Sequence, residues 1–486
     1  MATTSRDPNR YACGPIALAL STVAIVAGRA HAHGVGVRYE LPIPLWLYLA
    51  GAGLTVALSF GALAFFVYTA SGSRDDGGVT ILRSGPGRHV LASGALLALR
   101  TVGVGIYVIL IYAGLFGAQS PLKNITPVMV WAVWWVGMVY VSALLGNVWA
   151  LLNPLDTLFA WGEALHARLR PRRPLSPRFR YPERLGAWPA VALFVVFIWM
   201  ELVWERSDHP APLAAAILSY SALTWTAMLL FGRAQWLCRG EVFSLVFGLV
   251  AGFAPAELRA TSTGGRELTL RPYAVGLLAR GGAGASHVGL VIALLAAVTF
   301  DGFMETPLWA ALAAPVGAGA WLRTAGVAAA PLLFMIVFLL SCRLIAWCGG
   351  TQSPTWHIAG AFVMTLVPIA IAYHLAHYLS FLAAASQYLI PLASDPFGFG
   401  WNLFGTRSTF VRPGLIDARA VWYVSVAAIV AGHVAAVYLA HSVALEEFPD
   451  RRSALMSQWP MLILMVGYTM TSLWIISQPI VTRRLG

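Results

Sequence analysis

The sequence carries little charge for its length. Only 11% of the 486 residues are Asp, Glu, Lys or Arg, whereas soluble domains contain roughly 25%. Hydrophobic residues make up 59% of the chain, above the roughly 45–50% that is usual in soluble domains. This composition excludes a soluble cytosolic enzyme, a disordered protein and a nucleic-acid-binding domain. It predicts that the chain lies in a lipid bilayer.

Cysteine motifs and the common catalytic motifs are also missing. The four cysteines, at positions 13, 238, 342 and 348, form no CxxC pair and do not have the spacing of zinc ligands. The sequence contains no GxSxG elbow, no HExxH motif and no Walker A loop. It therefore gives no support to a disulfide framework, a structural zinc site or a nucleophilic serine.

Long apolar runs take up most of the chain. Because a helix needs roughly 20 apolar residues to cross a bilayer, the runs predict an all-α, polytopic membrane helical bundle of about 10–11 transmembrane helices. The apolar segment 240–255 is short, and it fits a re-entrant helix as well as a span. The other predicted spans are 43–68, 90–116, 127–152, 188–204, 212–231, 286–303, 327–348, 357–381, 420–441 and 459–479.

The N-terminus has the pattern of a secretory signal peptide. Two arginines precede the apolar run 15–28, and an Ala-His-Ala motif that ends at Ala32 follows it. We therefore expect residues 1–32 to be removed, with an uncleaved first helix as the alternative. The mature chain, 33–486, would then begin with His33 on the outer face of the membrane and form a single membrane domain.

Positive charge suggests which loops are cytoplasmic. The net charge is +12, and the densest basic run is the Arg-rich loop at 163–186, which the positive-inside rule places in the cytoplasm. We prefer the topology in which 240–255 does not cross, because it gathers one set of polar residues on the outer side. These residues are His33, Glu201, Glu205, Asp208, His209, Asp301, Glu305 and Asp395.

A long connection precedes the ninth predicted span. The loop at 383–419 is rich in aromatic residues and contains Asp395 in Ser-Asp-Pro-Phe-Gly. Connections of this length are usually functional or disordered, and the aromatic content argues against disorder. We therefore predict a structured lid over a site formed by the ends of neighbouring helices.

Ionisable residues inside spans are expensive to bury and so indicate sites. Arg100 requires a carboxylate or carbonyl partner. Glu201 and Glu205 are four residues apart and would share a helical face, where they can bind a cation, perform acid–base chemistry or contact lipid headgroups. Asp301, one turn before Glu305, is either a functional carboxylate or a helix cap.

Two pairs of histidines lie in the last spans. His374 and His377 are three residues apart, a spacing that suits a shared metal ion or two packed histidines. His433 and His441 follow on the next span, eight residues apart. The predicted depth of His433 differs from that of the first pair by about 10 Å or more, which argues against a bis-histidine haem.

A set of motifs occurs in order along most of the chain. It includes His33-Gly, Trp199-Met-Glu-Leu, Thr299-Phe-Asp-Gly-Phe, the segment from Leu366 to Tyr378, Ser394-Asp-Pro-Phe-Gly and Gly432-His-Val. These motifs resemble one family of bacterial multi-pass membrane proteins, the fenitrothion hydrolases. The resemblance implies hydrolysis of organophosphorus triesters to a dialkyl (thio)phosphate and a nitrophenol, in the bacterial plasma membrane.

Two functions follow from these observations. The first is a membrane phosphotriesterase that acts on apolar small molecules, with a divalent metal ion that activates water. The second is a membrane transporter or metal-handling protein without hydrolytic turnover. For the first, the predicted catalytic residues are Asp301, Glu201 and Asp395, the predicted metal ligands are His374, His377 and His33, and the other buried polar residues are Arg100, Glu205, His433 and His441.

Overall fold

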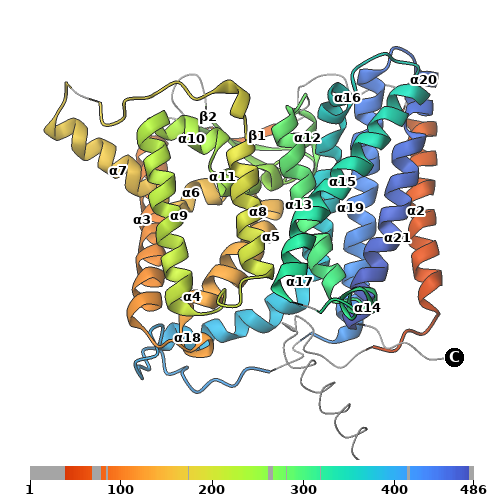
Figure 1. The fold of residues 1–486 in the computed structure, drawn as a ribbon. Coiled ribbons are helices and arrows are strands. Elements are labelled where there is room, and N and C mark those ends of the chain that lie inside the picture. The colour runs from red at the N-terminus through yellow and green to blue at the C-terminus, as the bar shows by residue number, and fades with distance from the viewer. Residues whose placement is uncertain are drawn as a thin grey trace, which may run out of the picture.

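The computed structural model describes residues 39–67, 78–83, 86–172, 174–260, 266–280, 282–317, 319–412 and 416–480. The predicted signal peptide and His33 lie outside these described residues. Within them the chain is mostly helical, as Figure 1 shows.

Ten helices or helix runs among the described residues are long and apolar enough to cross a membrane, which confirms the predicted bundle. Lipid offers no hydrogen bonds to the backbone, so a spanning segment becomes a helix that satisfies its own groups. The spanning elements are α2 (Leu45–Phe66), α3 (Pro86–Phe116), α4 (Ile125–Val128) with η3 (Met129–Gly137) and α5 (Met138–Leu145), α8 (Trp188–Leu202), α9 (Pro210–Phe231), α13 (Ala285–Met304), α15 (Ala320–Cys348), α16 (Thr355–Phe362) with η5 (Val363–Leu366) and α17 (Val367–Ala385), α19 (Ala418–Glu447) and α21 (Trp459–Ile480).

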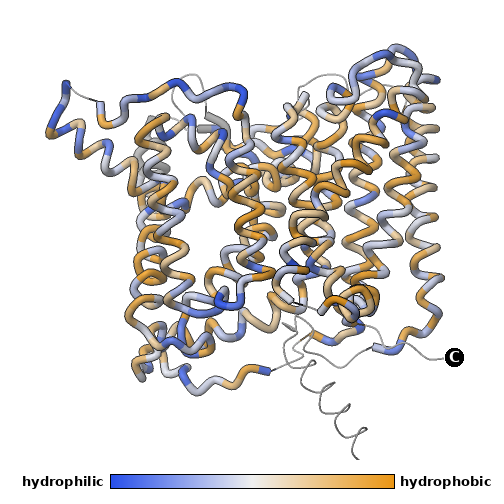
Figure 2. Tube along the Cα trace, viewed as in Figure 1, coloured by the Kyte–Doolittle hydropathy of each residue, from blue (hydrophilic) through white to orange (hydrophobic). Residues whose placement is uncertain are grey.

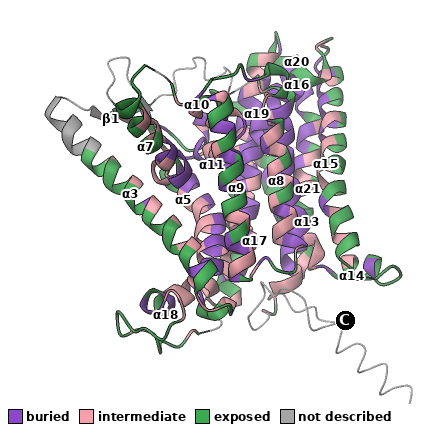
Figure 3. Ribbon diagram, turned by 60° about the vertical axis from the view of Figure 1, so that its left-hand side comes forward, coloured by how far each residue is buried: buried purple, intermediate pink, exposed green. Residues whose placement is uncertain are grey.

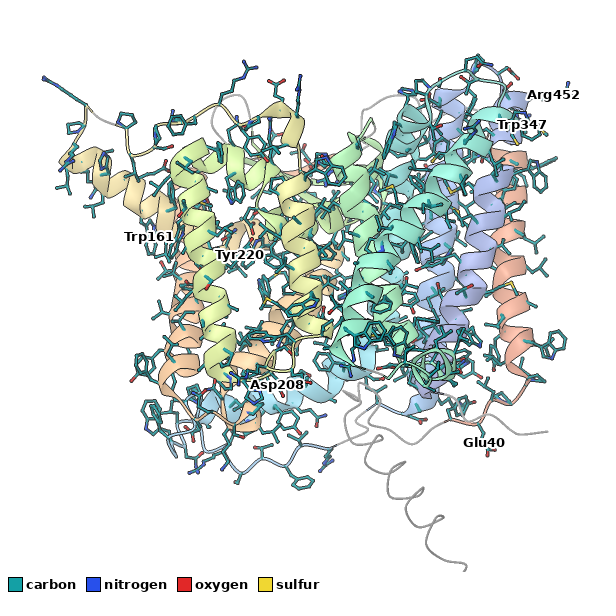
Figure 4. All side chains as sticks on the ribbon, in the orientation of Figure 1. Glu40, Trp161, Asp208, Tyr220, Trp347 and Arg452 are labelled. Carbon is teal, nitrogen blue, oxygen red and sulfur yellow. The ribbon has the colours of Figure 1, made fainter. Side chains whose placement is uncertain are left out.

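The bundle has two ends, which we name after short helices. The α7 end holds α7 (Pro154–Leu169) and α20 (Arg451–Ser457), and the α18 end holds α14 (Pro307–Ala313) and α18 (Leu389–Ser394) (Figure 1). Hydrophobic residues line the helices between the two ends (Figure 2). Figure 4 labels Glu40 and Asp208 at the α18 end and Arg452 at the α7 end.

A small antiparallel sheet settles the path of the segment 240–255. Strands β1 (Val79–Arg83), β3 (Arg266–Leu270) and β2 (Ala256–Ala260) pair in that order. Because β1 follows α2 at the α7 end, its pairing with β3 holds the hairpin at that end, where α9 also finishes (Figure 1). The intervening helices α10 (Arg233–Arg239) and α11 (Val242–Ala251), bent by 61°, therefore turn back without crossing. This path agrees with the topology in which 240–255 does not cross, whereas the side of the membrane on which the α7 end lies stays a prediction. The sequence did not predict the sheet.

Glu241 starts the second helix of this re-entrant segment. Its carboxylate is fully buried and accepts hydrogen bonds from the backbone N–H groups of Phe243 (3.2 Å) and Ser244 (2.7 Å). The hydroxyl of Tyr220, on α9, also donates to it. An acidic N-cap of this kind satisfies amides that have no acceptor within the helix.

The most buried spanning helices lie at the centre of the bundle. Helices α13 and α17 are mainly buried, whereas α3 and α9 present exposed faces (Figure 3). Helix α17 packs closely on α19, because a Cβ atom at Gly432 would lie 2.3 Å from the Cβ of Ala372. Small residues at such contacts allow two backbones to approach within the membrane.

The long aromatic connection is more regular than predicted. Helix α17 continues to Ala385, and η6 (Ser386–Tyr388) and α18 follow, so the irregular part begins only at Asp395. The carbonyl of Phe397 accepts a hydrogen bond from the N–H of Ala118 at 2.8 Å. The described part of the connection is therefore structured, as expected, and packs against the loop that precedes α4.

Candidate functional site

A hydrogen-bonded network near the α18 end joins three spanning helices and the π-helix η3. Asp301 lies in the last turn of α13, and Glu201 lies in the last turn of α8. Their partners are His377 and Tyr378 on α17 and Trp135 on η3. Asp301, Tyr378 and Trp135 are buried, and Glu201 is half-buried.

The distances in the network are those of strong hydrogen bonds. Asp301 Oδ2 lies 2.9 Å from Nε2 of His377 and 2.7 Å from the hydroxyl of Tyr378. The same hydroxyl lies 3.2 Å from Oε1 of Glu201, which also accepts a hydrogen bond from Nε1 of Trp135 at 2.8 Å. Tyr378 thus stands between two carboxyl groups, and we call these five residues the carboxyl network.

The geometry accommodates one exchangeable proton. A tyrosine hydroxyl has a single hydrogen, which it can donate to one oxygen at a time. The shorter distance assigns that hydrogen to Asp301. The contact with Glu201 is then a hydrogen bond only when Glu201 carries a proton and donates it to the tyrosine oxygen. Two carboxylates this close to one hydroxyl would otherwise repel each other in a medium of low dielectric constant.

Glu305 follows the network immediately outside α13. Burial, the largest cause, and the neighbouring Asp301 together raise the pKa of Glu305 to about 7, although His377 acts to lower it. Gly302 lies between the two acids, and a Cβ atom there would lie 2.7 Å from the hydroxyl of Tyr373. The end of α13 therefore packs directly on α17.

His374 and His377 do not share a site. His377 is bonded to Asp301, whereas the ring of His374 lies against Trp135, with centroids 5.7 Å apart. The ring of Tyr378 contacts both histidines. Nε2 of His374 is buried and has no hydrogen-bond partner among the described residues.

The residues described here do not fit the predicted metal ion. No group of three or more His, Cys, Asp or Glu side chains in the described part of the chain is arranged to hold one. The oxygen of Asp301 nearest His377 is already hydrogen-bonded to Tyr378. His33, the third predicted ligand, lies outside the described residues.

A second polar group lies one turn further into the bundle. The hydroxyl groups of Tyr468 and Thr299 are hydrogen-bonded to each other. The ring centroids of Tyr373 and His433 lie 6.5 and 5.9 Å from that of Tyr468. The Tyr373 hydroxyl and Nε2 of His433 are buried without a partner among the described residues, and Nδ1 of His433 bonds the carbonyl of Ile429 at 2.8 Å.

Two predicted site residues lie apart from the network. Helix α8 ends at Leu202, so Glu205 falls in the following turn and is exposed, which corrects the expected pairing of Glu201 and Glu205 on one helical face. Asp395 closes the turn after α18. Its carboxylate accepts the N–H groups of Phe399 (2.9 Å) and Gly400 (2.8 Å), as turn-forming aspartates do.

The remaining predicted polar residues lie toward the α7 end. Arg100 has the expected carboxylate partner, with Nη2 3.9 Å from Oδ2 of Asp156, and Arg233 bonds the same side chain at 2.8 Å. His441 is buried, and its Nδ1 lies 2.9 Å from Oε1 of Gln458.

Sequence reasoning missed Tyr378 and Trp135. Tyrosine and tryptophan are common in membrane segments, so neither stood out, although Tyr378 directly follows His377. Comparison of the chain with protein-family models, curated proteins and solved structures finds no match.

Proposed function

We propose that this multi-pass membrane protein is a proton-coupled transporter of a small solute. The observation that carries the proposal is the hydroxyl of Tyr378 between the carboxyl groups of Glu201 and Asp301. Ionisable groups inside a membrane bundle are costly and typically belong to ion pathways and proton relays. A pair of carboxyl groups that shares one proton can bind and release it as the surrounding helices move.

We infer the path of the proton from the hydrogen bonds of the network and from the neighbouring Glu305. Glu305, with a pKa of about 7, can exchange protons with water near neutral pH. His377 can receive a proton while it is bonded to Asp301, because the carboxylate stabilises the imidazolium. Glu201 can then hold the proton that it shares with Tyr378.

Interrupted helices support transport over a rigid structural role. The span that carries Trp135 contains the nine-residue π-helix η3, and η5 separates α16 from α17. Such irregular turns within helices occur frequently at functional sites. Discontinuous spanning helices also form the substrate and ion sites of many transporters.

Charge suggests the orientation. The positive-inside rule places the more basic end in the cytoplasm, and most loop arginines among the described residues belong to the α7 end. The carboxyl network would then lie near the outer face of the bacterial plasma membrane. The arginines of the α7 end include Arg168, Arg170, Arg172, Arg178, Arg180, Arg184, Arg233, Arg239, Arg271, Arg280, Arg451 and Arg452.

The test combines spectroscopy with flux measurements. Infrared difference spectra between low and high pH report protonated carboxyl groups, and we expect a band that Glu201→Gln removes and that Glu205→Gln, the exposed control, leaves in place. In proteoliposomes under a pH gradient, we expect solute-dependent proton currents that Asp301→Asn abolishes. If the band is absent and no solute from a broad panel gives a current, the proposal is wrong.

Hydrolysis is the second candidate. His377 bonded to Asp301 is a pair that can take a proton from water, and the resemblance to fenitrothion hydrolases favours a phosphotriester substrate. The described residues supply this pair, and the predicted metal ion stays a prediction. Release of nitrophenol from a nitrophenyl phosphotriester, lost in His377→Gln and without solute flux, would favour hydrolysis over transport.

A further inference from the structure

A large cavity lies at the α7 end, away from the carboxyl network. Its volume is about 580 Å³, which is enough for a small organic molecule. The wall is formed by the start of α7, by α11 and by the start of α13, and the exposed side chains of Cys238 and Arg280 lie at its rim.

Hydrogen-bond donors dominate the polar wall. The amide oxygens of Asn147 and Asn153 accept backbone N–H groups, which leaves their NH₂ groups as donors. Arg280 uses Nη1 on the carbonyl of Gly248 at 2.8 Å and has further N–H groups. Ser244 and His287 also line the cavity, where a hydroxyl and an imidazole N–H can each donate a hydrogen bond.

The only carboxylate that lines the cavity within the described residues is already neutralised. Asp156 lies 2.8 Å from Nη1 of Arg233 and 3.9 Å from Nη2 of Arg100, so its charge is balanced by these two guanidinium groups. Burial and the neighbouring Arg271 lower the pKa of Arg280, whereas Glu257 raises it. The cavity therefore has positive charge and donors that an anion would satisfy.

The opposite wall is apolar and includes Leu237, Leu245, Leu249 and Met364. We propose that the cavity binds an organic anion, a carboxylate or phosphate group joined to an apolar body. Its identification as the site of the transported solute rests on the proposed function, but binding itself does not. The same chemistry also belongs to the headgroup of an anionic lipid, and the experiment separates the two sources.

Cys238 provides a reporter within the wild-type chain. The thiol lines the cavity and is exposed, whereas Cys348 is half-buried and does not line it. We would measure the rate at which a neutral maleimide alkylates each cysteine of the purified protein by peptide mass spectrometry. The probes are benzoate and phenylphosphonate, with neutral benzamide and cationic benzylammonium as controls of similar shape.

We expect both anions to slow alkylation of Cys238 several-fold and to leave Cys348 unchanged. Arg280→Gln should remove this protection. Gly284→Leu should also remove it by filling the cavity, since a Cβ atom there meets no atom within 4 Å. The charge-matched control Arg184→Gln, an exposed position on η4 (Glu183–Leu185), should keep the protection.

Three results would overturn the proposal. They are no protection by any anion, equal protection by benzamide, and protection by benzylammonium. A fourth would assign the cavity to a lipid headgroup: Cys238 protected in bilayers of phosphatidylglycerol but not in phosphatidylcholine, with no added anion. Failure here leaves the carboxyl band of Glu201 unaffected, so it is distinguishable from failure of the proposed function.

Discussion

The hydroxyl of Tyr378 should stabilise the protein more than an ordinary buried hydroxyl. Tyr378→Phe removes its hydrogen bond to Asp301 (2.7 Å) and its contact with Glu201 (3.2 Å) while keeping the ring. A hydrogen bond to a charged group contributes roughly 1.5–3 kcal/mol, compared with roughly 0.5–1.5 kcal/mol for a neutral acceptor. We therefore expect Tyr378→Phe to lower the free energy of unfolding by about 2 kcal/mol.

Tyr140 offers a matched control. Its hydroxyl donates to the backbone carbonyl of Leu375 at 2.6 Å, a neutral acceptor in the same part of the bundle. Tyr140→Phe should therefore cost about 1 kcal/mol less than Tyr378→Phe. The difference should shrink in an Asp301→Asn background, because the acceptor is then no longer charged.

Reversible unfolding in mixed micelles, followed by tryptophan fluorescence, measures these free energies. The carboxyl infrared band should also shift in Tyr378→Phe and remain in place in Tyr140→Phe. Equal losses for the two variants, or an Asp301→Asn background that leaves the difference unchanged, would refute the assignment of Asp301 as a charged acceptor.

Three other changes test the structure. Burial raises the pKa of Glu305 from 4.5 to about 7. The free energy of unfolding of the native protein should therefore fall as pH rises from about 5 to about 8, by at most about 3 kcal/mol. Melting curves of Glu305→Gln should no longer show this pH dependence. Gly432→Ala should lower the free energy of unfolding by about 1–3 kcal/mol, since its methyl group would lie 2.3 Å from a side chain of α17. The control Gly467→Ala, whose methyl group would meet no atom within 4 Å, should leave the free energy of unfolding unchanged or raise it. Asp156→Asn should lower the free energy of unfolding, measured in the same assay, by on the order of 2 kcal/mol, because it leaves Arg100 unpaired within a span.

The spanning helices could be predicted from the sequence because the bilayer requires long apolar runs. The sheet could not. Each of its strands has five residues, and β1 pairs with a strand from the middle of the chain. Runs this short do not distinguish a strand from an irregular loop. The re-entrant path of α10 and α11 depends on that pairing, so sequence alone left it open.

The functional residues, too, could be predicted from the sequence only in part. Glu201, Asp301 and His377 stood out because ionisable residues are rare in spans. Their arrangement depends on how three helices pack together, and the hydrophobic periodicity of the sequence does not predict that packing. The pairing of Glu201 with Glu205 was wrong because α8 ends at Leu202, and no glycine or proline in the sequence indicates that end.

Helix α13 connects the two sites. It begins beside the cavity at Gly284 and ends at the carboxyl network, and His287 and Asp301 are separated by about 21 Å along one continuous helix. If a proton on the network changes how the end of α13 packs on α17 and so moves α13, the donors at the start of the helix move with it. If the sites are coupled, linkage requires reciprocity. Benzoate should shift the pH at which the Glu201 band appears, and pH should shift the concentration of benzoate that protects Cys238, by the same factor. The sites are separate, and transport is not coupled, if two results are found together: the protection of Cys238 does not depend on pH, and benzoate does not shift the infrared band.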